Sequence, residues 1–73
     1  MQTQEGDEVL LTAPTVARWL GVAVTTVYEQ AARGVIPHVR LWKGSRRTLI
    51  RFRRGDVETF LRERAVSPAI KRN

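Results

Sequence analysis

The sequence has no cysteine, a single histidine and no long apolar run. Without cysteine the chain can form neither a disulfide nor a thiolate metal site, so its core must rest on apolar packing alone. One histidine without a cluster of carboxylates around it gives no basis for catalysis, and we predict no enzyme activity, metal or cofactor. The apolar runs fall far short of the roughly 20 residues of a membrane-spanning helix. We therefore expect a soluble, cytoplasmic protein that has no contact with membranes.

Acidic side chains are missing from one long stretch of the chain. Between Gln30 and Gly55 there are eight basic side chains and no carboxylate, although the formal net charge of the whole protein is only +6. These eight are Arg33, Arg40, Lys43, Arg46, Arg47, Arg51, Arg53 and Arg54. A segregated positive charge of this kind indicates a polyanionic partner, usually nucleic acid.

A chain of 73 residues is long enough for one small domain. Residues 1–8 mix polar and acidic side chains without periodicity, and we expect them to form a flexible N-terminal arm. We predict the folded domain over residues 9–65 and a flexible C-terminal tail over residues 66–73.

Capping signals predict two helices in the first half of the domain. Thr12 is a good N-cap for a helix over Ala13–Leu20, which Gly21 ends. A second helix is predicted from about Val24 to Arg33, and Gly34 stands where a left-handed C-terminal residue is expected. The short link between the two helices has the length of the turn in a helix-turn-helix.

After Pro37 the pattern changes to the alternation of β-strands. We predict two strands that close as an antiparallel hairpin around the polar residues 43–48, with Arg40 and Trp42 on one face of the first strand. A last helix is predicted from Arg54 or Gly55 to Arg64, with Val57, Phe60 and Leu61 facing inward. The whole is an α+β fold, a small winged helix-turn-helix in which the hairpin is the wing.

The second helix is the candidate reader of DNA bases. In a helix-turn-helix this helix lies in the major groove with its N-terminal turn toward the base edges. The side chains presented there are Val24, Thr25, Thr26, Tyr28 and Glu29, with Arg33 farther along. A threonine can contact a thymine methyl group or a phosphate, a tyrosine a phosphate, and a glutamate the amino group of cytosine. Two alternatives remain: Thr26 is a half-buried helix residue, and Glu29 pairs with Arg33 four residues on.

The wing is the second candidate DNA contact. Its DNA-binding residues are predicted to be Arg40, Lys43, Ser45, Arg46, Arg47 and Arg51. A basic wing beside a recognition helix can follow the phosphate backbone or insert an arginine into a narrow minor groove. Charges on an edge strand also prevent sheets from aggregating, but the seven positive charges between Arg40 and Arg54 exceed that need. For Trp19 and Trp42 we favour packing on the protein over stacking on bases.

The order of these features resembles that of a known family. The segments LLT, WLGV, TTVYE, RGVIPHVR and IRFRRGDVETFL, between Leu10 and Leu61, are similar to those of the small excisionases, or recombination directionality factors, and their MerR-like winged-helix relatives. The resemblance implies that the second helix reads the major groove while the wing contacts the adjacent minor groove and phosphates. The chain departs from the family pattern at the N-cap Ala23, at Glu29, where a basic residue is frequent, and at Gly55, where an acidic residue is common.

The resemblance also implies a role in DNA recombination within a mobile genetic element. We expect a sequence-specific protein that binds and bends double-stranded DNA, with cooperative self-association on it, to promote excision by an integrase in a bacterial or phage nucleoid. One alternative is a small MerR-like transcription regulator. Another is an interaction module whose basic wing meets RNA or an acidic protein.

Overall fold

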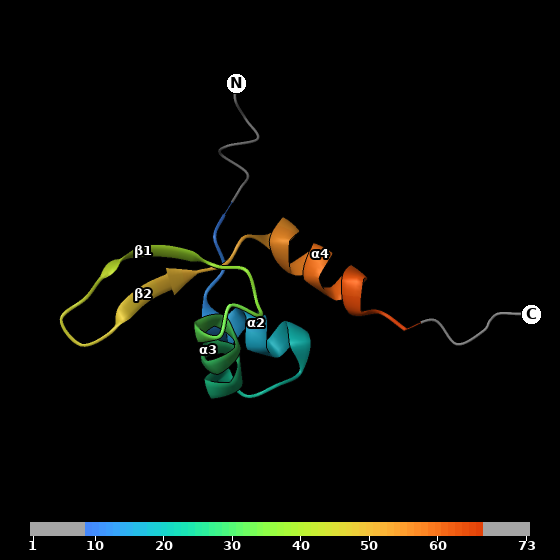
Figure 1. Cartoon of the computed structure of the whole chain (residues 1–73), viewed down its shortest axis with the longest axis horizontal. Coiled ribbons are helices and arrows are strands. Elements are labelled where there is room, and N and C mark those ends of the chain that lie inside the picture. Colours follow the sequence, from blue (N-terminus) through green and yellow to red (C-terminus); the bar gives the residue numbers. More distant parts are fainter. Residues whose placement is uncertain (1–8, 67–73) are drawn as a thin grey trace, which may run out of the picture.

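The computed structural model describes residues 9–66 of the chain. These residues form three helices and a two-stranded antiparallel sheet (Figure 1). In chain order the elements are α2 (Ala13–Leu20), α3 (Val24–Ala32), β1 (Val39–Lys43), β2 (Thr48–Arg51) and α4 (Arg54–Arg64). The predicted α+β winged helix-turn-helix is thereby confirmed. The predicted flexible arm and all of the predicted tail except Val66 lie outside the described residues.

Local signals set the bounds of α2. The Thr12 hydroxyl accepts a hydrogen bond from the Thr15 backbone N–H over 3.4 Å, which caps the first turn as predicted. At the other end Gly21 adopts a left-handed φ of 73°, and its N–H donates to the Ala17 carbonyl over 2.8 Å. Both ends of the helix are therefore encoded within a few residues of it.

The helix α3 begins without a side-chain cap and ends at a glycine. Ala23 has the extended backbone of an N-cap, but its methyl group cannot accept a hydrogen bond. Beyond the helix, Gly34 has a φ of 77°, and the Val35 N–H returns to the Gln30 carbonyl over 2.9 Å. The predicted stop at Gly34 is confirmed, and the departure from the family pattern at Ala23 leaves α3 without a side-chain cap.

The hairpin is irregular at one position. Arg40 pairs with Ile50 and Trp42 pairs with Leu49, so Leu41 is an extra residue that forms a β-bulge. Directly paired residues of an antiparallel sheet share a face, whereas Leu49 and Ile50, as neighbours on one strand, lie on opposite faces. Trp42 therefore lies on the face opposite Arg40, and the prediction that the two share a face was wrong. Strict alternation fails there because the bulge adds a residue to one strand only.

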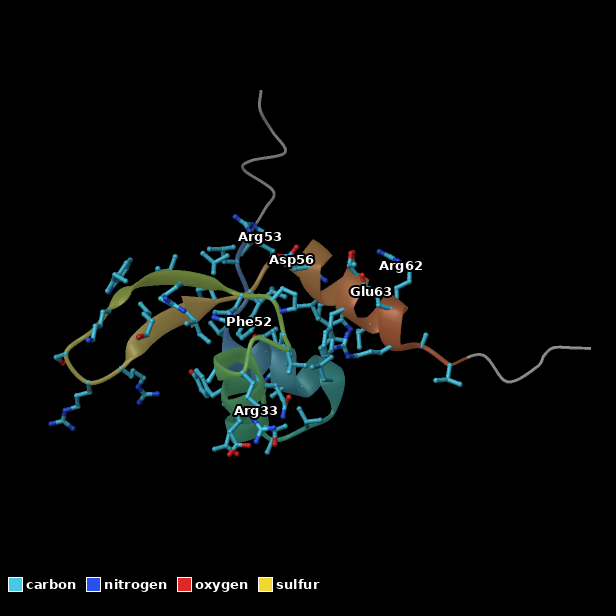
Figure 2. All side chains as sticks on the ribbon, in the orientation of Figure 1. Arg33, Phe52, Arg53, Asp56, Arg62 and Glu63 are labelled. Carbon is cyan, nitrogen blue, oxygen red and sulfur yellow. The ribbon has the colours of Figure 1, made fainter. Side chains whose placement is uncertain are left out.

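One buried cluster joins the helices to the hairpin. Phe52 lies fully buried where the base of the hairpin meets the helices (Figure 2). Its backbone forms an isolated bridge to Leu11, the residue that precedes the capped start of α2. The buried residues are Ala13, Val16, Ala17, Val27, Ala31, Ile36, Phe52 and Val57. The cluster draws on α2, α3 and α4, and the hairpin joins it through Phe52, which directly follows β2, and through the half-buried Ile50. This packing fixes the base of the hairpin against the helices.

The helix α4 extends from the core on the side opposite the hairpin (Figure 1). Val57 is its one buried residue within the described chain, while Phe60 and Leu61 are half-buried against the core, as predicted. None of the helices in residues 9–66 is long and apolar enough to cross a membrane.

Candidate nucleic-acid interface

The exposed face of α3 carries only part of the predicted set of base readers. Thr25 and Glu29 are exposed, whereas Thr26 is half-buried. Val24 and Tyr28 are also half-buried and pack against the core cluster. The two exposed side chains are thus the ones that α3 presents most fully to a partner, and the reading roles of all five residues stay predictions.

Glu29 does not form the alternative ion pair with Arg33. Within residues 9–66, Arg33 is in no ion pair, and its contact with Glu29 is a backbone bond in which the Arg33 N–H donates to the Glu29 carbonyl over 3.1 Å. Both side chains are exposed. The Glu29 carboxylate and the Arg33 guanidinium are consequently each available to a ligand.

The basic residues of the hairpin occupy two different faces. Arg40 is exposed and pairs across the sheet with Ile50, whereas Arg51 pairs with Val39 on the opposite face. Arg51 is half-buried, and its guanidinium donates to the Ile50 carbonyl over 2.8 Å. Arg40 and Arg51 therefore cannot contact DNA from the same face of the wing. The predicted DNA contact of Arg51 stays a prediction.

The tip of the hairpin presents four exposed polar residues. The Gly44 N–H donates to the Arg47 carbonyl over 2.8 Å and closes the turn. Lys43, Ser45, Arg46 and Arg47 are exposed around it. In the described part of the chain no side chain of these four forms a hydrogen bond or an ion pair. The charged side chains of the predicted basic tip thus have no polar partner within residues 9–66.

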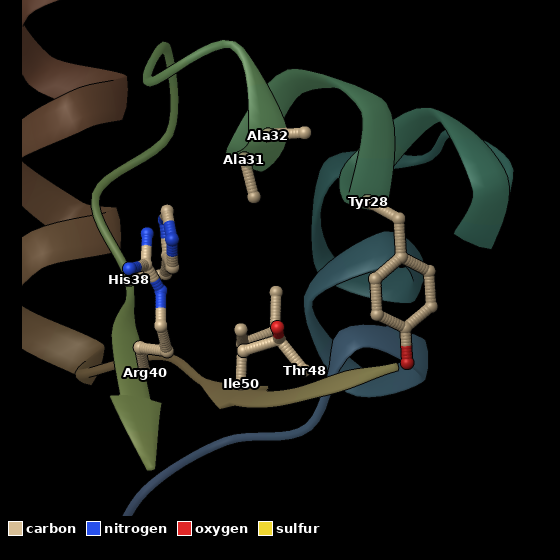
Figure 3. A pocket seen from close by; sticks show the side chains of 7 residues that line it. All are labelled: Tyr28, Ala31, Ala32, His38, Arg40, Thr48 and Ile50. Atoms are coloured by element: carbon tan, nitrogen blue, oxygen red, sulfur yellow. The ribbon is translucent and has the colours of Figure 1, made fainter. Parts of the chain in front are cut away.

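A groove separates α3 from the hairpin (Figure 3). Its volume is about 310 Å³. Tyr28 projects into it from α3, and Thr48 and Ile50 project into it from β2 (Figure 3). A second hollow of about 320 Å³ shares these three residues and continues along the hairpin to Arg46 and Arg47. The helix α3 and the basic wing therefore border one continuous concave surface, which we call the α3–wing groove.

The polar groups of the α3–wing groove are basic or neutral. No carboxylate lines either hollow in the described chain. The hydroxyls of Tyr28 and Thr48 and the guanidinium of Arg40 have no hydrogen-bond partner within residues 9–66. Unpartnered donors beside a positive surface are the groups that phosphate oxygens accept from.

His38 also lines the groove, just before β1 begins. Its Nδ1 lies 3.1 Å from the Ile36 carbonyl, to which it donates, and its ring centroid lies 6.3 Å from that of Phe52. In the part of the chain that the structure describes, no three acidic or histidine side chains gather as metal ligands would. His38 is therefore held as a structural residue at the edge of the groove.

Sequence reasoning missed Thr48 and misjudged Trp42. Thr48 lines both hollows, and the signal for it is its place two residues before Ile50 on the same strand, which puts both side chains on one face. Trp42 was expected to pack on the protein, but 61% of it is exposed. Trp19 has the Arg54 guanidinium over its ring, 5.6 Å from the centroid, and keeps 38% of its surface exposed.

Comparison with known proteins gives one family match. A family model described as a helix-turn-helix domain matches residues 10–65, which covers α2, α3, the hairpin and α4. No curated protein and no solved structure matched the chain.

Proposed function

Because this chain belongs to the helix-turn-helix domain family, we propose that it binds double-stranded DNA in a sequence-specific manner. One observation carries the proposal: Tyr28 of α3 and Thr48 of β2 line the same groove, and the arginines of the wing tip continue it. A duplex can meet the recognition helix and the basic wing together only if both border one surface. The role is binding and not catalysis.

In the proposed complex the first turn of α3 lies in the major groove. Thr25 and Glu29, which are exposed there, face the base edges. The hairpin then reaches the adjacent minor groove, where Arg46 and Arg47 contact phosphates or enter the groove. The α3–wing groove faces the sugar–phosphate backbone that separates the two.

We further propose that the binding is architectural. Several copies would bind side by side and bend the DNA so that an integrase excises the element that carries it, in a bacterial or phage nucleoid. The matched family includes excisionase-like proteins, and the five segments quoted above resemble those of small excisionases. DNA bending by basic wings fits this use, because a bent duplex touches more of the protein surface, which offsets the cost of deforming the DNA.

A salt titration on duplex DNA tests the binding proposal. If about five basic side chains neutralise phosphates, the logarithm of the association constant falls against the logarithm of the salt concentration with a slope of about −4 to −5. The double variant Arg46→Ala with Arg47→Ala should reduce the steepness of that slope by about 2 and lower the affinity for all DNA sequences to the same extent. A flat salt response of the wild-type chain would instead favour the interaction-module alternative.

The excision role needs a separate experiment. DNA flanking the gene is footprinted, and the bend of each bound fragment is measured by permuting the position of the site. An integrase encoded beside the gene is then assayed for excision with and without the protein. We expect excision to depend on the protein and to fall with the wing double variant. Bound DNA that alters transcription but leaves excision unchanged would assign the protein to regulation.

A further inference from the structure

A separate hollow lies between α2 and the start of α4. Its volume is about 440 Å³, and it is lined by Leu11, Thr15, Arg18, Trp19 and Arg54. None of these residues lines the α3–wing groove. The α4 helix, whose first residue borders this hollow, extends from the core on the side opposite the hairpin (Figure 1). We infer that this hollow, the α2–α4 cleft, binds an acidic segment of a partner protein, which goes beyond the proposed DNA binding.

The charge of the cleft is the first argument for this partner. Arg18 is exposed and forms no hydrogen bond or ion pair within residues 9–66. Arg54 lies over the Trp19 ring and forms no ion pair with Glu58, which stands one helical turn farther along α4. Neither guanidinium is neutralised, and no carboxylate lines the cleft in the described chain. Two guanidinium forks at one site match the carboxylates of an acidic segment.

The apolar part of the cleft is the second argument. Trp19 is 38% exposed, and Leu11 is half-buried beside it. Tryptophan and arginine are enriched among the few residues that contribute most of the binding energy at protein–protein interfaces. The same arrangement disfavours a nucleobase, because Arg54 already covers one face of the indole on which a base would stack. The occupant that fits is an acidic peptide with aliphatic side chains between its carboxylates.

The position of the cleft gives the interaction a use. Arg18, Trp19 and Arg54 do not line the α3–wing groove, so in the proposed complex a copy bound to DNA through that groove would keep this second surface open. A protein held there is brought to the DNA site without competing for it, and its effective concentration at that site rises.

Two variants with the same loss of charge test the inference. Arg18→Gln with Arg54→Gln removes two charges from the cleft, and Arg46→Gln with Arg47→Gln removes two from the wing. All proteins also carry Trp42→Phe, so that fluorescence reports on Trp19 alone. The probe is a short synthetic peptide of repeated Glu-Glu-Leu, and the control peptide repeats Gln-Gln-Leu. Each protein is titrated with the two peptides and, separately, with duplex DNA.

We expect the cleft variant to bind the acidic peptide about tenfold more weakly, while the wing variant stays within about twofold of the parent protein. With DNA the order is reversed. Single Arg18→Gln removes no hydrogen bond or ion pair within the described chain, so it guards against a folding defect of the double variant. We expect it to weaken the binding of the acidic peptide about threefold.

Other results overturn the inference. One is an equal loss of affinity for the acidic peptide in the two charge-matched variants. Another is an affinity for the glutamine peptide as high as that for the acidic peptide. A third is no change in Trp19 fluorescence when the acidic peptide is added. If the cleft variant loses as much affinity for duplex DNA as the wing variant does, Arg18 and Arg54 belong to the DNA interface. If the wing variant keeps full DNA affinity, the proposed DNA function fails, whereas the result with the peptide still decides the role of the cleft.

Discussion

Leu11 and Phe52 exchange two backbone hydrogen bonds across 41 positions of sequence, with the Leu11 N–H donating over 2.7 Å and the Phe52 N–H over 2.9 Å. This bridge ties the end of β2 to the segment that enters α2. The Phe52 side chain is fully buried beside it. The orientation of the wing against the helices therefore depends on this one pair together with the cluster around the phenylalanine ring.

Phe52→Leu should lower the free energy of unfolding by about 1.5 kcal/mol, because the smaller side chain leaves part of a closed core site unfilled. The matched control is Trp42→Leu, which changes an exposed aromatic residue on the neighbouring strand and should cost less than about 0.5 kcal/mol. Urea denaturation followed by circular dichroism measures both. Equal losses would mean that Phe52 does not hold the hairpin to the core.

Ala23→Ser should raise the free energy of unfolding by about 1 kcal/mol, because Ala23 has the backbone of an N-cap and lacks the oxygen that would accept an N–H of α3. The converse change, Thr12→Ala, removes the working cap of α2 and should cost about the same amount. Thermal unfolding compares the two. A serine that leaves the melting temperature unchanged would contradict the view that the start of α3 is under-capped.

Two glycine substitutions should change the free energy of unfolding in opposite directions. Gly34→Ala forces a β-carbon into a left-handed φ of 77° and should cost about 1 kcal/mol, although no atom lies within contact distance to clash with it. Gly55→Ala lies inside α4, also in open space, and should stabilise the protein by about 0.5 kcal/mol. Denaturant midpoints of the two variants decide this. The same sign for both would refute the conformational explanation.

Thr25→Ala should change which DNA sequence is preferred, because the exposed threonine offers its methyl and hydroxyl groups to base edges. The expected loss on the best site is about fivefold, with little change on unrelated duplexes. The control is Thr59→Ala, an exposed threonine on α4. Selection from a random pool measures the preference, and an unaltered ranking of sites for Thr25→Ala would rule out its reading role.

Tyr28→Phe and Thr48→Val should each lower the affinity for every duplex about threefold. Each substitution removes one hydroxyl that lines the α3–wing groove and has no hydrogen-bond partner in the described chain. The ranking of sequences should stay the same, since phosphates carry no base identity. Thr59→Val serves as the control outside the groove. Competition binding on several duplexes measures the losses, and a loss confined to one sequence would assign the hydroxyl to base contact.

The helices could be predicted from sequence because their ends depend on neighbours in the chain. Thr12, Gly21 and Gly34 act within one helical turn of the bounds that they set. The exposure of Thr25 and the basic tip of the wing followed from the same short-range patterns. These parts of the candidate site were therefore accessible without coordinates.

Contacts between segments far apart in the sequence could not be predicted from such short-range patterns. The bridge of Leu11 to Phe52 joins two segments that no local signal connects. The bulge at Leu41 arises from the pairing of two strands, so the alternation within one strand could not reveal that Trp42 changes face. Thr48 and Arg18 gain their importance only from the hollows that the tertiary structure forms around them.

Ion pairs are scarce within residues 9–66, and this affects how the protein responds to ionic strength. Arg53 and Asp56 form a pair at 3.8 Å, but Arg33, Arg40, Arg46 and Arg47 have no carboxylate partner within residues 9–66. Added electrolyte screens the mutual repulsion of these cations and so favours the folded chain when it is alone. The same electrolyte competes with the proposed DNA ligand. Folding and complex formation should thus respond to salt in opposite directions.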